Sequence, residues 1–105
     1  MIDVTQEDRS GWRLVVVRGR ADAEAADGLE AALRGAVGEH SKIAVDFANL
    51  DYISSAGLRA VLQAARAAEG AGAQFAVCGL SPNVKKVFDM SGMHHLLRIH
   101  GELPC

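Results

Sequence analysis

The stretch DYISSAGLR, residues 51–59, joins two segments of different periodicity and decides how the chain folds. Before it, KIAVDF (42–47) is apolar almost without alternation, which is typical of a buried central strand. After it, apolar residues recur at helical spacing until the GAG at 70–72: Leu58, Val61, Leu62 and Ala65. Two serines and a glycine therefore lie between a strand and a helix.

The N-terminal half contains two further strands and a helix. WRLVVVRG (12–19) is a β-branched run that predicts a buried strand, and IDVTQED before it is expected to pair with it as a hairpin. Asp22 then stands where an N-cap belongs, and Gly38 ends the helical pattern that follows. The apolar face of this helix is Ala26, Leu29, Leu33, Ala36 and Val37.

The C-terminal half repeats the alternation of strand and helix. QFAVCG (74–79) predicts a strand, and Ser81-Pro82 is a typical helix start, with a capping hydroxyl followed by a proline at the first helical position. Val84, Val87 and Phe88 form the apolar side of this helix, and Gly92 stops it. LLRIH (96–100) predicts a last short strand.

Strands that alternate with helices predict an α/β fold: one domain over residues 1–105, with a mixed sheet of four to five strands and helices packed on it. The strands at 42–47 and 74–79 are expected to be parallel, joined by a right-handed crossover, with the N-terminal hairpin at the other side of the sheet. Partners of such folds meet the loops at the carboxyl ends of the parallel strands. Residues 51–59 lie at that end.

Composition excludes several classes of function. The chain has 105 residues, with 11 basic and 13 acidic side chains and a net charge of −2, and its longest basic run is Lys85-Lys86. Nucleic acid is therefore not an expected partner, because phosphate binding needs a concentrated basic face. No apolar run approaches the roughly 20 residues that span a bilayer, and the N-terminus is polar and acidic, so we expect a cytoplasmic protein with no membrane association. For such a chain we expect no disulfide between Cys78 and Cys105.

The serines do not match the common catalytic patterns. A nucleophile elbow needs glycine two residues before the serine, where this chain has Ile53 before Ser55 and Tyr52 before Ser54. No lysine stands at P-loop spacing, which argues against a nucleotide site of that type. Asp46 and Asp51 flank the strand end, but they have no third ligand nearby in the sequence. We therefore expect neither an enzyme nor a cofactor or metal ion.

A hydroxyl at the start of a helix suits phosphorylation. If Ser55 is the N-cap of the helix that follows, its oxygen lies where the first-turn N–H groups stabilise negative charge by about 0.3 to 1 kcal/mol. Gly57 lets another backbone segment come close, and Leu58 anchors the helix. The simpler interpretation is that Ser54 and Ser55 only cap the helix. The spacing alone does not separate these two interpretations.

FANLDYISSAGLRAVL resembles the signature of the STAS domain, in particular that of the bacterial anti-sigma-factor antagonists. In that signature a strand ending in Asp leads through Leu, an aromatic residue and a phosphorylatable serine to Gly-Leu and a helix. The resemblance covers the whole chain, because VVVRGRADAEAADGLEAAL and FAVCGLSPNVKKVFDMSGMHHLLRI are similar to the family's flanking segments. The match is most specific between the strand and the Gly-Leu pair.

The resemblance implies a phosphorylation-switched binding module. Unphosphorylated members bind an anti-sigma factor that is also a serine kinase of the histidine-kinase-like ATPase type, and so release a sigma factor. Phosphorylation ends this binding, and a serine phosphatase restores it. By position the phosphoacceptor is Ser55, two residues before Gly57-Leu58. Ser54 and Ala56 replace an Asp and a hydroxyl residue of many relatives, and Ser54 is a second candidate acceptor.

Further residues are expected at the partner surface around Ser55, some with a second interpretation. Asp22 is a helix cap first and a partner contact second, and Arg59 either contacts a partner carboxylate or is only solvated. The expected partner-binding set is Asp22, Asp51, Ser54, Ala56, Gly57 and Arg59. The alternative function is that of a STAS subunit without phosphorylation in a lipid-transporting ABC ATPase complex.

Overall fold

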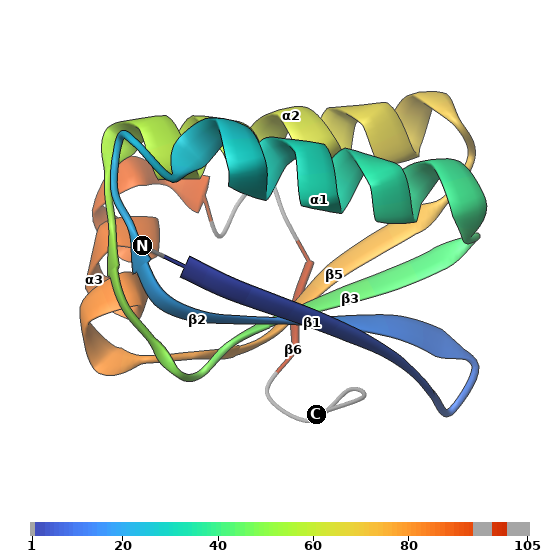
Figure 1. Ribbon diagram of the computed structural model, residues 1–105, viewed down its shortest axis with the longest axis horizontal. Helices are drawn as coiled ribbons and strands as arrows, with labels where there is room; N and C mark the ends of the chain where they lie inside the picture. Colours follow the sequence, from blue (N-terminus) through green and yellow to red (C-terminus); the bar gives the residue numbers. More distant parts are fainter. Residues whose placement is uncertain (1, 94–97, 101–105) are drawn as a thin grey trace.

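One mixed sheet carries three helices in the part of the chain that the computed structural model describes, residues 2–93 and 98–100 (Figure 1). In chain order the elements are β1 (Ile2–Arg9), β2 (Trp12–Ala21), α1 (Ala26–Glu39), β3 (Lys42–Phe47), β4 (Leu50–Ile53), α2 (Ser55–Gly70), β5 (Gln74–Leu80), α3 (Pro82–Ser91) and β6 (Arg98–His100). The α/β class and the mixed sheet predicted from the sequence are confirmed.

The strand order is β1-β2-β3-β5-β6, and β4 pairs with β2 off this path. β1 and β2 form the predicted antiparallel hairpin at one edge, while β2, β3, β5 and β6 are mutually parallel. The carboxyl ends of β2, β3 and β5 therefore meet at one end of the sheet, and α1 and α2 both begin there (Figure 1). This arrangement places residues 51–59 at the end of the sheet that the sequence predicted.

β4 was not predicted from the sequence. The chain leaves β3 at Phe47, turns, and continues as β4 beside the end of β2, where the register shifts between Gly19 and Arg20. The Asp46 carboxylate accepts a hydrogen bond from the N–H of Ala48 at 2.8 Å, and Gly19 N–H donates to Asn49 O at 3.2 Å. The turn is thus held on both sides, and it delivers the segment before α2 to the end of β2.

α1 and α2 pack side by side on one face of the sheet (Figure 1). The predicted apolar face of α1 is confirmed, because all five of its residues are buried. The predicted face of α2 was partly wrong. Small residues lie at its centre, and the leucines lie only at its border. The buried residues of α2 are Gly57, Ala60, Val61, Ala64 and Ala68.

A second, smaller apolar cluster lies on the opposite face of the sheet, formed by Leu14, Val16, Ala44 and Cys78 with Trp12 at its border. Cys78 is disulfide-bonded, and its partner lies outside the described residues. The expectation of unpaired cysteines was therefore wrong, since it rested on the compartment expected for the chain rather than on geometry. β6 extends the sheet over residues 98–100, and the first two residues of the predicted strand at 96–100 lie outside the described part of the chain.

The boundaries of α3 follow the sequence prediction closely. The hydroxyl of Ser81 accepts a hydrogen bond from Val84 N–H, Pro82 is the first helical residue, and Gly92 ends the helix in the left-handed conformation at φ 74°. Over residues 2–93 and 98–100, none of the helices has the length and hydropathy that a membrane crossing requires.

Candidate functional site

Ser54, not Ser55, is the N-cap of α2. Its backbone is extended, its hydroxyl accepts a hydrogen bond from Gly57 N–H at 3.1 Å, and the same hydroxyl donates to the carbonyl of Ala21 at 3.0 Å. Its N–H also donates to that carbonyl, at 2.9 Å. The expectation of a cap at Ser55 was wrong by one residue, because the Ala21 carbonyl at the end of β2 selects the serine that reaches it.

Ser55 is the first residue of α2, and its side chain is exposed. In the described part of the chain its hydroxyl has no protein partner. The first-turn N–H groups of Ser55 and Ala56 likewise meet no acceptor among the described residues, since Ser54 caps only Gly57. A helix N-terminus of this kind favours an added anion. Ser55 therefore combines an accessible hydroxyl with a local field that tolerates negative charge.

Gly57 holds this helix start against the end of β2. It is buried, and a Cβ added there would lie 2.8 Å from the carbonyl oxygen of Ala21 and 2.9 Å from Cγ1 of Ile53. The prediction that glycine permits a close approach is confirmed, and the approaching segment belongs to this chain. Gly57 thus permits this close packing and is not itself part of the exposed surface.

A shallow hollow of about 300 Å³ opens between the starts of α1 and α2. It brings three of the predicted residues together: Ser55, Ala56 and Arg59. The remaining lining residues are Ala23, Ala26, Asp27, Glu30 and Ala60. Sequence reasoning missed Asp27 and Glu30 as site residues. Their spacing of three residues at the start of a helix would have indicated a shared face, but not that this face turns toward α2.

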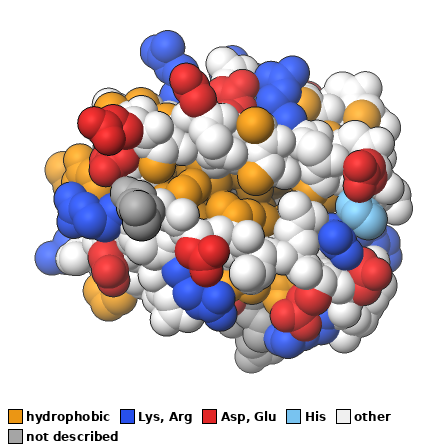
Figure 2. Space-filling view, in the orientation of Figure 1, with side chains coloured by type: hydrophobic (Ala, Val, Ile, Leu, Met, Phe, Trp, Pro, Cys, Tyr) orange, Lys and Arg blue, Asp and Glu red, His pale blue; other side chains and the backbone are white. Residues whose placement is uncertain are grey.

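The charges in the hollow are of both signs. Arg59 is exposed and has no ion pair within the described residues, whereas Glu30 accepts a hydrogen bond from the guanidinium of Arg34 at 3.4 Å. Over the helical layer, acidic and basic side chains are interspersed (Figure 2). The field at Ser55 therefore depends on its immediate neighbours.

Asp22 lies outside this hollow and lines a second one with Ala25 and Gly28. The sequence prediction made it the N-cap of α1, but the N-cap is Ala25, and no side chain caps it. Asp22 instead caps the turn that precedes α1, because its carboxylate accepts a hydrogen bond from Ala25 N–H at 3.0 Å. This hydrogen bond is the main cause that lowers the pKa of Asp22 below its usual range.

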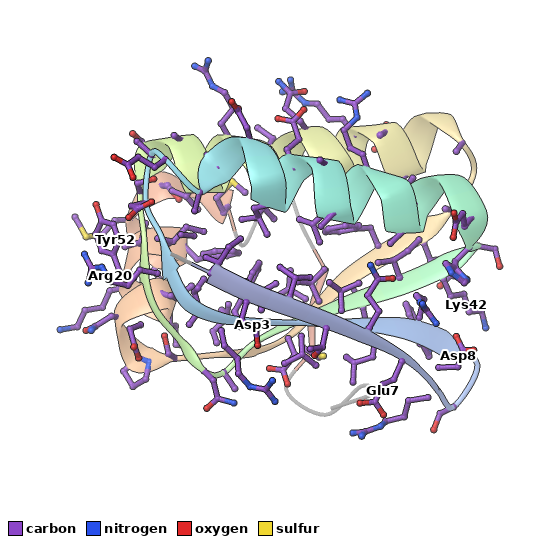
Figure 3. The ribbon with its side chains drawn as sticks, in the orientation of Figure 1. Asp3, Glu7, Asp8, Arg20, Lys42 and Tyr52 are labelled. Atoms are coloured by element: carbon purple, nitrogen blue, oxygen red, sulfur yellow. The ribbon has the colours of Figure 1, made fainter. Side chains whose placement is uncertain are left out.

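Asp51 also lies outside the hollow, with an exposed side chain on β4. Its backbone carbonyl accepts a hydrogen bond from the side-chain amide of Asn83 at 3.5 Å, which ties β4 to α3. Next to it, the guanidinium of Arg20 stacks on the ring of Tyr52 at 4.5 Å from the ring centre, at the end of the sheet where α2 begins (Figure 3). Asp51 and Tyr52 therefore form an exposed rim on β4, next to the start of α2 and tied to α3.

The side chains around Ser55 favour binding or modification over catalysis. The hollow that it lines contains no histidine or cysteine, and neither of its carboxylates, on Asp27 and Glu30, is hydrogen-bonded to the Ser55 hydroxyl in the described part of the chain. Among the described residues no group of three His, Cys, Asp or Glu side chains is placed to hold a metal ion. What the geometry offers is an exposed hydroxyl at a helix start that the neighbouring Ser54 caps.

Comparison with known proteins places this geometry in a family. The family model described as "Mlab, STAS domain" matches residues 5–98. A protein of Bordetella bronchiseptica (strain ATCC BAA-588 / NCTC 13252 / RB50), provisionally named anti-sigma factor antagonist BtrV, is 34% identical over 90 residues, which cover 85% of this chain and 78% of that protein.

Two solved structures of the anti-sigma factor antagonist SpoIIAA share the fold. The unphosphorylated form has a TM-score of 0.77 at 23% identity and covers 95% of this chain and 90% of its own. The phosphorylated form, from Bacillus, has a TM-score of 0.70 at 23% identity and covers 97% and 93%. The match of the family model over most of the chain, together with the 34% identity to the Bordetella protein, shows that this chain belongs to the STAS domain family.

Proposed function

We propose that this protein is an anti-sigma-factor antagonist whose binding is switched by phosphorylation of Ser55. In its unphosphorylated form it binds an anti-sigma factor that is also a serine kinase of the histidine-kinase-like ATPase type, and a sigma factor is released. A serine phosphatase resets the switch. The proposal makes the protein a binding protein rather than an enzyme, as are relatives named as anti-sigma factor antagonists.

The observation that carries the proposal is that two adjacent serines differ in hydrogen bonding and in exposure. The hydroxyl of Ser54 is occupied by Ala21 and Gly57, while the hydroxyl of Ser55 is exposed and has no partner in the described part of the chain. A phosphate on Ser54 would break the cap that fixes α2, whereas a phosphate on Ser55 leaves it intact. This favours Ser55 over Ser54 as the acceptor.

Phosphorylation would act on the partner surface and spare the fold. A phosphoserine adds about −1.5 to −2 charge near pH 7, and an uncompensated charge brought into an interface costs about 2 to 5 kcal/mol of binding free energy. This corresponds to a loss of affinity of roughly 30- to 5,000-fold. The helix start stabilises the same anion by only about 1 kcal/mol, and it does so in the free protein as well.

The proposed docking surface surrounds Ser55 at the end of the sheet. Ala56 and Arg59 share its hollow, and Asp51 lies on the neighbouring rim. Asp22 contributes through the turn before α1. Ser54 and Gly57 contribute indirectly, because they fix the conformation in which Ser55 is presented.

The direct test is to identify the partner and then the modification. Proteins that co-purify with the chain from its native cell are identified, and the candidate kinase is incubated with the chain and ATP before intact-mass measurement. The proposal expects one phosphate on the wild type, one on Ser54→Ala and none on Ser55→Ala. A phosphate that persists in Ser55→Ala and disappears in Ser54→Ala would contradict the assignment.

A second candidate function is that of an interaction subunit without phosphorylation in a lipid-transporting ABC ATPase complex. We retain this candidate because the description of the matching family model names Mlab and does not name an antagonist. Under it Ser55 is a contact residue only. Stable co-purification with an ABC ATPase, with no phosphate on the chain, would favour this second candidate over the first.

A further inference from the structure

We propose that Arg59 is the internal counter-ion of phosphorylated Ser55, so that the guanidinium pairs with the phosphate across one turn of α2. The inference rests on the proposed function, because it concerns the modified state of Ser55. Under this proposal Arg59 takes part in the switch by pairing with the phosphate, and it is more than a solvated surface residue.

The placement of Arg59 carries the argument. Ser55 and Arg59 are four residues apart on one helix, a spacing that makes their side chains neighbours, and both line the same hollow. Both side chains are exposed, so neither has to leave a packed position to meet the other. Arg59 has no ion pair in the described part of the chain, whereas Arg34 on α1 is already paired with Glu30. A dianionic phosphate with a planar guanidinium within reach forms short, charge-assisted hydrogen bonds.

The opposite wall of the hollow acts in the same direction. Asp27 and Glu30 line it from α1, and their carboxylates repel a phosphate on Ser55. Glu30 is partly compensated by Arg34, while Asp27 has no ion pair within residues 2–93 and 98–100. The phosphate is therefore turned away from α1 and along α2, toward Arg59.

This pairing gives the modification two effects at once. In the unphosphorylated protein Arg59 is available to a carboxylate of a partner. After phosphorylation it is held by the phosphate. One chemical event then adds an anion to the docking surface and withdraws a cation from it.

The test measures the ionisation of the phosphate itself. Phosphoserine is installed at position 55 during translation of the full chain, by genetic code expansion, so no kinase is needed. The phosphorus NMR signal is then titrated with pH in the wild type, in Arg59→Gln and in Arg66→Gln. Arg66 is the matched control, because it is exposed on the same helix, and its loss changes the net charge equally.

Arg59→Gln is expected to raise the midpoint of the phosphate titration by about 0.3 pH unit, since the loss of a neighbouring cation disfavours the dianion. Arg66→Gln should move it by less than about 0.1 unit, because Arg66 lies 11 residues, or about 16 Å, further along the helix than Ser55. Arg59→Lys should keep most of the wild-type midpoint. Asp27→Asn should lower it.

Equal midpoints in Arg59→Gln and Arg66→Gln would overturn the counter-ion role, because both variants would then report only the net charge. The proposed function would survive that result. Conversely, failure of every candidate kinase to modify Ser55 would remove the proposed function, while the NMR comparison would still decide how Arg59 responds to a phosphate.

Discussion

α2 and α3 begin in nearly the same way and yet differ in what they present to solvent. In each, a serine hydroxyl accepts a hydrogen bond from an N–H of the first turn and donates one to a carbonyl of a distant strand, that of Ala21 for Ser54 and that of Leu50 for Ser81. The next residue differs. α3 continues with a proline, which has neither hydroxyl nor N–H, whereas α2 continues with the exposed Ser55.

The comparison separates the residue that caps α2, Ser54, from the residue that offers an exposed hydroxyl, Ser55. α3 shows that one serine is sufficient to start a helix and dock it to the sheet. α2 has a second serine that the cap does not need, set at the end of the sheet where partners of such folds bind. The additional hydroxyl is exposed and is not used by the cap, and the following predictions test this separation from the largest expected effect to the smallest.

The largest effect is expected when charge is added at Ser55. Ser55→Asp should weaken binding of the anti-sigma partner by about 30-fold, and phosphoserine at this position by up to roughly 5,000-fold. The melting temperature should change little, because the side chain is exposed. Calorimetric titration of the partner and thermal unfolding measure the two quantities. Loss of folding in Ser55→Asp, or binding equal to that of the wild type, would contradict the separation.

A methyl group at Gly57 should break the docking of α2. Gly57→Ala places a Cβ within 3 Å of the Ala21 carbonyl and of Ile53, and such overpacking costs about 1 to 3 kcal/mol of unfolding free energy. Gly35→Ala is the matched control, because Gly35 lies in the middle of α1 and an added Cβ meets nothing within 4 Å. It should stabilise the protein by about 0.5 to 1 kcal/mol. Urea unfolding measures both changes, and equal signs for the two variants would refute the close approach.

Removal of either capping hydroxyl should cost a comparable amount. Ser54→Ala and Ser81→Ala each lose a cap and a hydrogen bond to a strand carbonyl, so each should lower the unfolding free energy by about 0.5 to 2 kcal/mol. Ser55→Ala should change it by less than about 0.5 kcal/mol. The idea that Ser54 carries the cap would fail if Ser55→Ala proved the more destabilising of the neighbouring pair.

The smallest effect concerns Asp22 and depends on pH. Its pKa is lower in the folded than in the unfolded chain, chiefly because its carboxylate accepts the Ala25 N–H. The stabilisation is therefore complete above the unfolded value of about 3.9 and is lost as the pH falls through the lower, folded value. Asp22→Asn keeps an acceptor oxygen and removes the charge. Unfolding measured between pH 7 and pH 2.5 should show a smaller acid loss in the variant, and parallel curves would exclude this contribution.

Much of the fold follows from local patterns in the sequence. The β-branched runs, the apolar face of α1 and the Ser81-Pro82 start with its Gly92 stop each depend on neighbours within one turn or one strand. The parallel pairing of β3 and β5 follows from the helix between them. Such features are predictable because the chemistry that sets them is near in sequence.

The features that escaped prediction depend on contacts between distant segments. Ser54 and Ser55 are equally suited to cap a helix, and only the carbonyl of Ala21, 33 residues earlier than Ser54, decides between them. Alanines lie at the centre of the α2 contact with the core, while size alone favours its leucines. β4 is too short to be read from its four residues, and its pairing depends on the shifted end of β2.

The residues of the candidate site that lie near Ser55 in the sequence could be predicted to share a surface, and the more distant ones could not. Ser55, Ala56 and Arg59 do share one surface, since they lie within five residues on one helix. Asp27 and Glu30 were missed because only the packing of α1 beside α2 brings them there. Asp22 and Asp51 lie outside the hollow, because their positions are set by the turn before α1 and by β4.

The Ala21 carbonyl has a consequence for the proposed phosphorylation of Ser55. It accepts two hydrogen bonds from Ser54 and abuts Gly57, so the segment around Ser55 is locked to the end of β2. Drawing this segment out as an extended peptide would break these contacts. If Ser55 is phosphorylated as proposed, we expect the kinase to recognise the folded surface, and a synthetic peptide that spans residues 51–59 should be a poor substitute for the intact domain.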